Sequence, residues 1–120
     1  MSTLAGKRIL VVEDEFIIAA MVEDTLIDAG AVVIGPVYKI QDGLLFVQRE
    51  AIDAAVLDVN INGEPSDAIA EALMVRGIPM VLATGYGATG LKRFHAPVLD
   101  KPYTAETLIA ALQRAMASRP

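Results

Sequence analysis

Five polar residues follow the short apolar runs of this chain, in positions suited to phosphoryl chemistry. Glu13 and Asp14 follow the first run, Asp58 the third, Thr84 the fourth and Lys101 the fifth. If the first and third runs form neighbouring strands, three carboxylates share one pocket, and like charges that close need a cation. Oxygen ligands without sulfur favour Mg²⁺, which binds one or two carboxylates and keeps several waters. With a lysine and a hydroxyl beside it, such a site can transfer a phosphoryl group to a carboxylate nucleophile.

The apolar runs alternate with longer stretches of helical periodicity, which predicts alternating strands and helices. The predicted strands span residues 8–12, 31–37, 54–58, 79–84 and 97–100. The predicted helices span residues 15–29, 40–50, 66–76 and 104–117. Residues 59–66 are predicted to form a loop because they are rich in turn-forming residues.

Several residues mark where these helices begin, end or weaken. Gly30 is a predicted C-terminal cap of the first helix, whereas Gly43 weakens the prediction of the second. Ser66 or Asp67 is expected to cap the third helix, and Thr104 to start the last.

Three glycines, Gly85, Gly87 and Gly90, disfavour a regular helix between the fourth and fifth strands. We expect a short or mobile fourth helix in this stretch, one that becomes ordered on phosphorylation or on partner binding.

A parallel sheet with helices on both faces explains the alternation of elements. Crossover helices return the chain to the same end of a sheet, so successive strands run parallel. The hydrophobic content of 54% and the mean hydropathy of +0.48 agree with strands buried on both faces. We therefore predict a doubly wound α/β fold with its ligand at the carboxyl ends of the strands, where the five polar residues lie.

Composition excludes several other classes of protein. The 120 residues make one domain, and the absence of cysteine removes disulfides, thiolate metal sites and cysteine nucleophiles, which suggests a reducing cytoplasm. The net charge of −5 and the lack of a basic cluster argue against nucleic-acid binding. No apolar run approaches the length of a membrane span. The single histidine, His95, leaves little room for histidine metal sites or a catalytic triad.

The sequence over residues 7–116 resembles the receiver domain of two-component response regulators. The marks of that family are the acidic pair Glu13–Asp14, the strand-end Asp58, Thr84 and the dipeptide Lys101–Pro102. The segment Leu82–Ala83–Thr84–Gly85–Tyr86, with the stretch over residues 57–64, further resembles the receiver subgroup named FATGUY after its fourth-strand motif. The resemblance implies a flavodoxin-like (CheY-like) fold with five strands in the order 2-1-3-4-5. It also implies a single receiver domain over residues 1–120 with no output domain.

The resemblance assigns the acidic residues to phosphoryl acceptance and metal binding. Asp58 would accept a phosphoryl group from a phosphohistidine. Asp14 and Asp58 would bind Mg²⁺ directly, together with the backbone carbonyl of Asn60, and Glu13 would act largely through water.

The same resemblance assigns Lys101 and Thr84 to the phosphoryl oxygens. Phosphorylation replaces one negative charge on Asp58 with nearly two, so these residues gain a partner only in the modified state, as a switch requires. The Lys101–Pro102 peptide bond is expected to be cis.

One position departs from the family pattern. Most receivers carry Tyr or Phe three residues before the lysine, where this chain has Val98. Tyr86 and Tyr103 are the available substitutes for that aromatic switch, and we favour a gating role over the phosphoryl site for Tyr86.

The function implied is that of a phosphoacceptor switch, one that catalyses at most its own phosphorylation and slow dephosphorylation. The phosphodonor would be a sensor histidine kinase, of the HWE or a related type, or a phosphotransfer protein. Output would pass to a downstream protein through the fourth-helix region, the fifth strand and the last helix, unless the chain serves as a phosphate sink.

Three other functions fit parts of the pattern. A receiver-like interaction module would work without phosphorylation. A nucleotide-binding enzyme would use Gly85, Gly87 and Gly90, which match G-x-G-x-x-G but follow the fourth strand instead of the first. A hydrolase of the haloacid dehalogenase kind would use Asp58 and Asn60 as a degraded Asp-x-Asp motif, but a second aspartate for acid–base chemistry is missing there.

Overall fold

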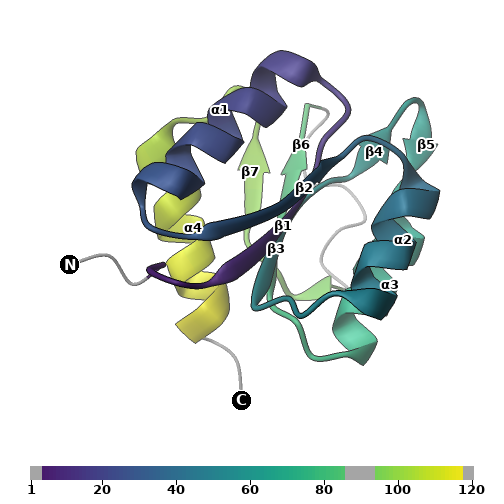
Figure 1. The fold of residues 1–120 in the computed structure, drawn as a ribbon. Helices are drawn as coiled ribbons and strands as arrows, with labels where there is room; N and C mark the ends of the chain where they lie inside the picture. Colours follow the sequence, from purple (N-terminus) through teal and green to yellow (C-terminus); the bar gives the residue numbers. More distant parts are fainter. Residues whose placement is uncertain (1–3, 86–93, 118–120) are drawn as a thin grey trace.

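The computed structural model describes residues 4–85 and 94–117, which form a central parallel sheet flanked by helices (Figure 1). The sheet holds five strands in the order β2-β1-β3-β6-β7, which is 2-1-3-4-5 when only its own strands are counted. Its strands are β1 (Arg8–Val12), β2 (Val32–Val37), β3 (Ala54–Asp58), β6 (Met80–Thr84) and β7 (Val98–Asp100). The predicted doubly wound, flavodoxin-like fold is confirmed.

Two helices cover each face of the sheet. Helices α1 (Phe16–Asp28) and α4 (Ala105–Ala117) lie on one face, and α2 (Ile40–Arg49) and α3 (Asp67–Val75) on the other, as Figure 1 shows.

The central strands send alternate side chains into two cores, one under each pair of helices. Along β1, Ile9 and Val11 join the core under α1 and α4, while Leu10 and Val12 join the core under α2 and α3. All four side chains are fully buried. This burial on both faces is why the strand reads as a continuous apolar run.

Residues 59–66 differ from the prediction of a plain loop. They contain a short antiparallel hairpin made of β4 (Asn60–Ile61) and β5 (Glu64–Pro65). Asn62 and Gly63 at its tip have φ of 53° and 83°, and two positive φ values in succession are typical of a tight hairpin turn with the Asn-Gly sequence. The hairpin is too short to give a strand pattern, although its turn residues are visible in the sequence.

The third helix has Ser66 at its N-cap, one of the two predicted positions, but lacks the predicted capping bond. Ser66 occupies the N-cap position of α3, but its side chain makes no capping bond, and its Oγ donates instead to the carbonyl of Asp58 at 2.5 Å. The prediction for the last helix holds better, because the hydroxyls of Thr104 and Thr107 accept each other's backbone N–H at 3.1 and 3.0 Å. This is a capping box with threonine in place of Glu or Gln.

Gly43 has a packing role that its helix propensity conceals. A Cβ added at this position would lie 2.7 Å from Cδ1 of Ile69, a fully buried residue of α3. The glycine therefore allows α2 to approach α3 closely.

Two further points bear on the predictions. The expected fourth helix lies within residues 86–93, outside the described residues. Among the helices in residues 4–85 and 94–117, none has both the length and the apolar character needed to cross a membrane.

Candidate functional site

The site lies at the carboxyl edge of the sheet, where β1, β3 and β7 end. Val12, the last residue of β1, lies opposite Leu57 in β3, so Glu13 and Asp58 emerge side by side. Carboxylate oxygens of Glu13, Asp14 and Asp58 all lie within 4.8 Å of one another. The sheet order therefore brings together the three acids that the sequence predicts to share a pocket.

Lys101 is the cation at the centre of this cluster. Its Nζ lies 2.7 Å from Oδ2 of Asp58, 2.9 Å from Oε1 of Glu13 and 3.9 Å from Oε2 of Glu15. The Lys101 side chain is 12% exposed, and those of Glu13 and Asp58 are 3% and 6% exposed. One largely buried ammonium is thus shared between two buried carboxylates.

Burial and pairing oppose each other in the protonation of this cluster. Burial raises the pKa of Glu13 to about 7, against the opposing effect of the hydrogen bond from Lys101. Burial by itself would lower the pKa of Lys101, but its hydrogen bonds to Asp58 and Glu13 outweigh that effect and raise it. Lys101 therefore stays cationic at neutral pH, while Glu13 can exchange a proton there.

The hairpin of residues 59–66 holds the two aspartates in place. The backbone N–H of Asn60 donates to Oδ1 of Asp58 at 3.1 Å, and that of Asn62 donates to Oδ2 of Asp14 at 2.8 Å. Ser66 binds the Asp58 carbonyl from the other end of the hairpin. The hairpin thus positions both acids.

A polar cavity of 410 Å³ opens over the cluster. Its lining consists of Asp14, Glu15, Asp58, Asn60, Gly63, Gly85 and Lys101. The donor set in and beside it is made of carboxylate and carbonyl oxygens without sulfur or imidazole, which fits a hard cation such as Mg²⁺.

Several solved structures that resemble this chain are response-regulator receiver domains. SdrG from Sphingomonas melonis is 43% identical, covers 97% of this chain and 99% of its own, and superimposes with a TM-score of 0.82. A response regulator receiver protein from Sinorhizobium medicae is 26% identical and covers 98% and 100% of the two chains, with a TM-score of 0.81. The chain belongs to the response-regulator receiver family. The scan of protein-family models and the search of curated proteins gave no match.

A third similar structure bears on the metal. The receiver domain of a sensor histidine kinase from Pseudomonas aeruginosa was solved with a magnesium ion coordinated in its active-site cleft. It is 24% identical to this receiver, covers 95% of this chain and 100% of its own, and has a TM-score of 0.80. At 24% identity, the likeness supports the shared fold and does not by itself show that the present chain binds a metal.

Thr84 and the Lys101–Pro102 dipeptide lie at the same edge of the sheet. Thr84 ends β6 and is 1% exposed, and its carbonyl accepts the backbone N–H of Lys101 at 2.9 Å. The Lys101–Pro102 peptide bond is cis, the isomer that the resemblance implies. Val98, at the position where most receivers have an aromatic residue, is partly buried and packs against the core under α2 and α3.

The two tyrosines proposed as substitutes for the aromatic switch have different outcomes. Tyr103 is partly buried and packs against the core under α1 and α4. Burial raises its pKa to about 12, and the negative charge of Glu13 adds to this effect. Tyr86 lies outside the described residues, so its gating role stays a prediction.

Three residues of the site were missed in the sequence. Glu15 was visible as the third of three successive acids, yet it was not assigned to the site. Asn62 falls within residues 59–66, which the sequence predicts to be a loop, and Ser66 is predicted only as a possible helix cap. Their contacts with Asp14 and Asp58 depend on the hairpin, for which the sequence offers the Asn62–Gly63 pair as its only signal.

The nucleotide-binding interpretation does not fit this architecture. A dinucleotide fingerprint belongs in the first βαβ unit of a sheet ordered 3-2-1-4-5-6. Here Gly85 follows β6, the fourth strand of a sheet ordered 2-1-3-4-5.

Proposed function

We propose that this receiver is a phosphorylation-dependent switch that accepts a phosphoryl group on Asp58. The observation that carries the proposal is the environment of the Asp58 carboxylate. It is buried at the end of a central strand, 2.7 Å from the Lys101 ammonium, within a cluster of three carboxylates beside a polar cavity. Such a carboxylate is held in one orientation and is paired with a cation that can later bind a phosphoryl oxygen.

The transfer step is a displacement at phosphorus. An Asp58 carboxylate oxygen forms the new O–P bond while the P–N bond of a phosphohistidine breaks, and the leaving imidazole nitrogen keeps the electron pair. If the other ring nitrogen of the phosphohistidine carries a proton, the products are an acyl phosphate and a neutral imidazole. A sensor histidine kinase or a phosphotransfer protein supplies the phosphohistidine.

Mg²⁺ is the proposed cofactor. Asp14 and Asp58, with the backbone carbonyl of Asn60, would hold it, and Glu13 would act largely through water. When bound, the ion supplies positive charge that offsets the carboxylates and the incoming phosphoryl oxygens. Asp14 and Asp58 already accept backbone hydrogen bonds from the hairpin, so their side chains are oriented before any ion arrives.

Lys101 and Thr84 are the proposed sensors of phosphorylation. Lys101 is shared between Asp58 and Glu13, so a phosphoryl group carrying nearly two negative charges competes with Glu13 for the ammonium. Thr84 lies in the strand beside β3, one residue beyond Ala83, the partner of Asp58, which suits a hydrogen bond to a phosphoryl oxygen. This change of partners is the differential contact that shifts the conformation.

Finer assignments rest on the motif over residues 82–86. Its resemblance to the FATGUY motif supports membership of that subgroup and a kinase of the HWE or a related type. We propose that the receiver acts as a stand-alone cytoplasmic switch that signals through protein contact or serves as a phosphate sink. Its catalysis would be limited to its own phosphorylation and slow dephosphorylation.

Intact mass after incubation with acetyl phosphate tests this proposal. The expected result is one labile phosphoryl group, dependent on Mg²⁺ and absent from Asp58→Asn. The matched control Asp24→Asn changes an exposed aspartate of α1 and should label like the wild type. Labelling of Asp58→Asn would refute the assignment. If a phosphorylated histidine kinase also failed to label the wild type, the protein would act as an interaction module without phosphorylation.

A further inference from the structure

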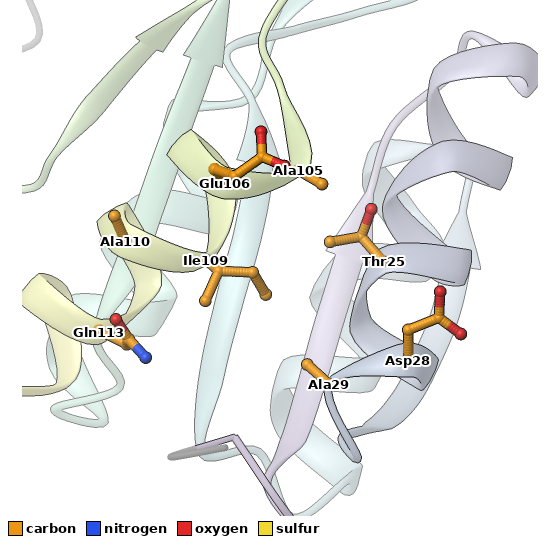
Figure 2. Close-up of a pocket in the computed structure, with 8 residues that line it drawn as sticks. All are labelled: Thr25, Asp28, Ala29, Ala105, Glu106, Ile109, Ala110 and Gln113. Carbon is orange, nitrogen blue, oxygen red and sulfur yellow. The ribbon is translucent and has the colours of Figure 1, made fainter. Parts of the chain in front are cut away.

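A groove separates α1 from α4 on the face of the sheet that these helices share. Its volume is 490 Å³. Figure 2 shows Ala29, which directly follows α1, facing Ile109 on α4, with Ala105 and Ala110 on the same helix as Ile109. Alanine side chains keep the space between the helices open, so an apolar side chain from outside can be buried there against Ile109.

The groove carries negative charge on both sides. Asp28 lies on the α1 side and Glu106 on the α4 side, and the described residues that line the groove include no lysine or arginine. Within residues 4–85 and 94–117, neither carboxylate forms an ion pair with a basic side chain.

Asp28 is placed where its own helix disfavours it. It is the last residue of α1, whose final turn contains no basic residue. The carbonyl end of a helix carries partial negative charge, so an aspartate there is unfavourable and a cation is favoured. Glu106, in the first turn of α4, is at the favourable end of its helix. The charge on Asp28 is thus not explained by the stability of α1.

We propose that this groove docks a basic amphipathic helix of a partner protein. An apolar side chain of that helix inserts between Ala29 and Ile109, and flanking Lys or Arg side chains pair with Asp28 and Glu106. A helix with apolar residues at positions i, i+3, i+4 and i+7 presents this pattern along one face. The groove shares no residue with the phosphoryl-acceptor site, so the proposal is made for the unphosphorylated protein.

The charge pattern favours such a partner over a second copy of this chain. A two-fold dimer through the groove would bring Asp28 and Glu106 towards the same acidic pair of the second copy. Like charges in an interface oppose association, whereas a basic helix offers complementary charge. The net charge of −5 strengthens the same preference.

A designed peptide provides the probe. It is a fluorescein-labelled helix of about 18 residues, with leucine on one face and lysine elsewhere, and its counterpart carries glutamate in place of lysine. Fluorescence anisotropy with the wild-type protein should show binding of the lysine peptide alone. Amide shifts in NMR spectra should concentrate around Ala29, Ala105 and Ala110.

Three variants separate the groove from general electrostatic attraction. The double variant Asp28→Asn with Glu106→Gln should weaken binding about tenfold, and Ala110→Arg, which fills the groove from an exposed position, should do the same. Asp42→Asn, in α2 on the opposite face, should leave the Kd about unchanged. Circular dichroism checks that each variant is folded.

Three results of the binding experiments would overturn the proposal. They are no binding of the lysine peptide, equal binding by wild type and groove variants, and shifts located outside the groove. Sedimentation equilibrium of the protein alone would also overturn it if a dimer formed and Ala110→Arg dissociated that dimer, since the groove would then be an interface between copies.

Discussion

Replacing Lys101 with methionine removes the positive charge from the buried cluster and keeps much of the side-chain volume. In the wild type, the Lys101 ammonium lies 2.7 Å from Asp58 and 2.9 Å from Glu13, and all three side chains are buried or nearly so. Removing one partner of a buried ion pair costs about 3–5 kcal/mol, because the remaining charge is uncompensated. We expect Lys101→Met to lower the free energy of unfolding by about 3 kcal/mol at about pH 8.

The stability that Lys101→Met loses should be smaller at low pH than at high pH. The pKa of Glu13 is raised from 4.5 to about 7, so between these values the native state holds more protons than the unfolded state. The contribution of Glu13 to the free energy of unfolding therefore falls as pH rises from 4.5 to 7. Without Lys101 the pKa of Glu13 rises further, so ionised Glu13 lowers the variant's free energy of unfolding above pH 7. Well below pH 7, Glu13 is protonated in both proteins and this extra loss of stability disappears. The gap between wild type and variant should narrow by about 1 kcal/mol at about pH 5.5.

Mg²⁺ should also reduce the difference in free energy of unfolding between wild type and Lys101→Met. The variant's carboxylates lack their internal cation, so they bind Mg²⁺ more tightly, and binding to the native state alone stabilises it. Urea unfolding followed by circular dichroism, at both pH values and with or without Mg²⁺, measures these effects.

The control is Lys7→Met, which makes the same change at an exposed position and should alter stability by less than about 0.5 kcal/mol. A loss in Lys101→Met that was as small as in this control, or independent of both pH and Mg²⁺, would refute the reasoning.

Three further predictions concern the neighbours of Asp58. Ser66→Ala should lower the free energy of unfolding by about 1–3 kcal/mol, because it removes a buried hydrogen bond to the Asp58 carbonyl; a loss near zero in urea unfolding would contradict this. As pH rises towards 7, the affinity for Mg²⁺ measured by calorimetry should increase by up to about tenfold per pH unit, because the cation favours ionised Glu13. Above pH 7 the affinity should level off. Glu13→Gln should remove the increase, and a wild-type affinity that did not change with pH would count against this prediction. Tyr103 should ionise near pH 12 in an absorbance titration. Tyr103→Phe should remove the ionisation step near pH 12; loss of a step near pH 10 instead would contradict this prediction. Because the native state retains the Tyr103 proton, wild-type stability should fall between pH 10 and 12.

Much of this receiver was predictable because its strands and its site depend on local sequence. A strand buried on both faces must be apolar throughout, so β1 and β3 are visible as unbroken runs. The residues after such runs meet at one edge of a parallel sheet, which is why Asp14, Asp58 and Lys101 could be grouped.

What was missed depends on contacts between distant segments. The hairpin over residues 59–66 has strands of two residues, too short for any periodicity, and its role appears only where Asn62 reaches Asp14 across the sheet edge. From the sequence alone, Gly43 indicates only a weak helix. Its packing role depends on Ile69, a residue of another helix. The groove between α1 and α4 depends on how two helices lie on the sheet, which no local pattern specifies.

Locating the phosphoryl group on the chain tests the central claim most directly. The protein would be phosphorylated in Mg²⁺ by a phosphorylated histidine kinase, treated with borohydride to convert any aspartyl phosphate to homoserine, and mapped by peptide mass. We predict homoserine at position 58 alone, and none when Mg²⁺ is omitted. Homoserine at position 14 or at any other aspartate, or none after incubation with either the kinase or acetyl phosphate, would contradict the account.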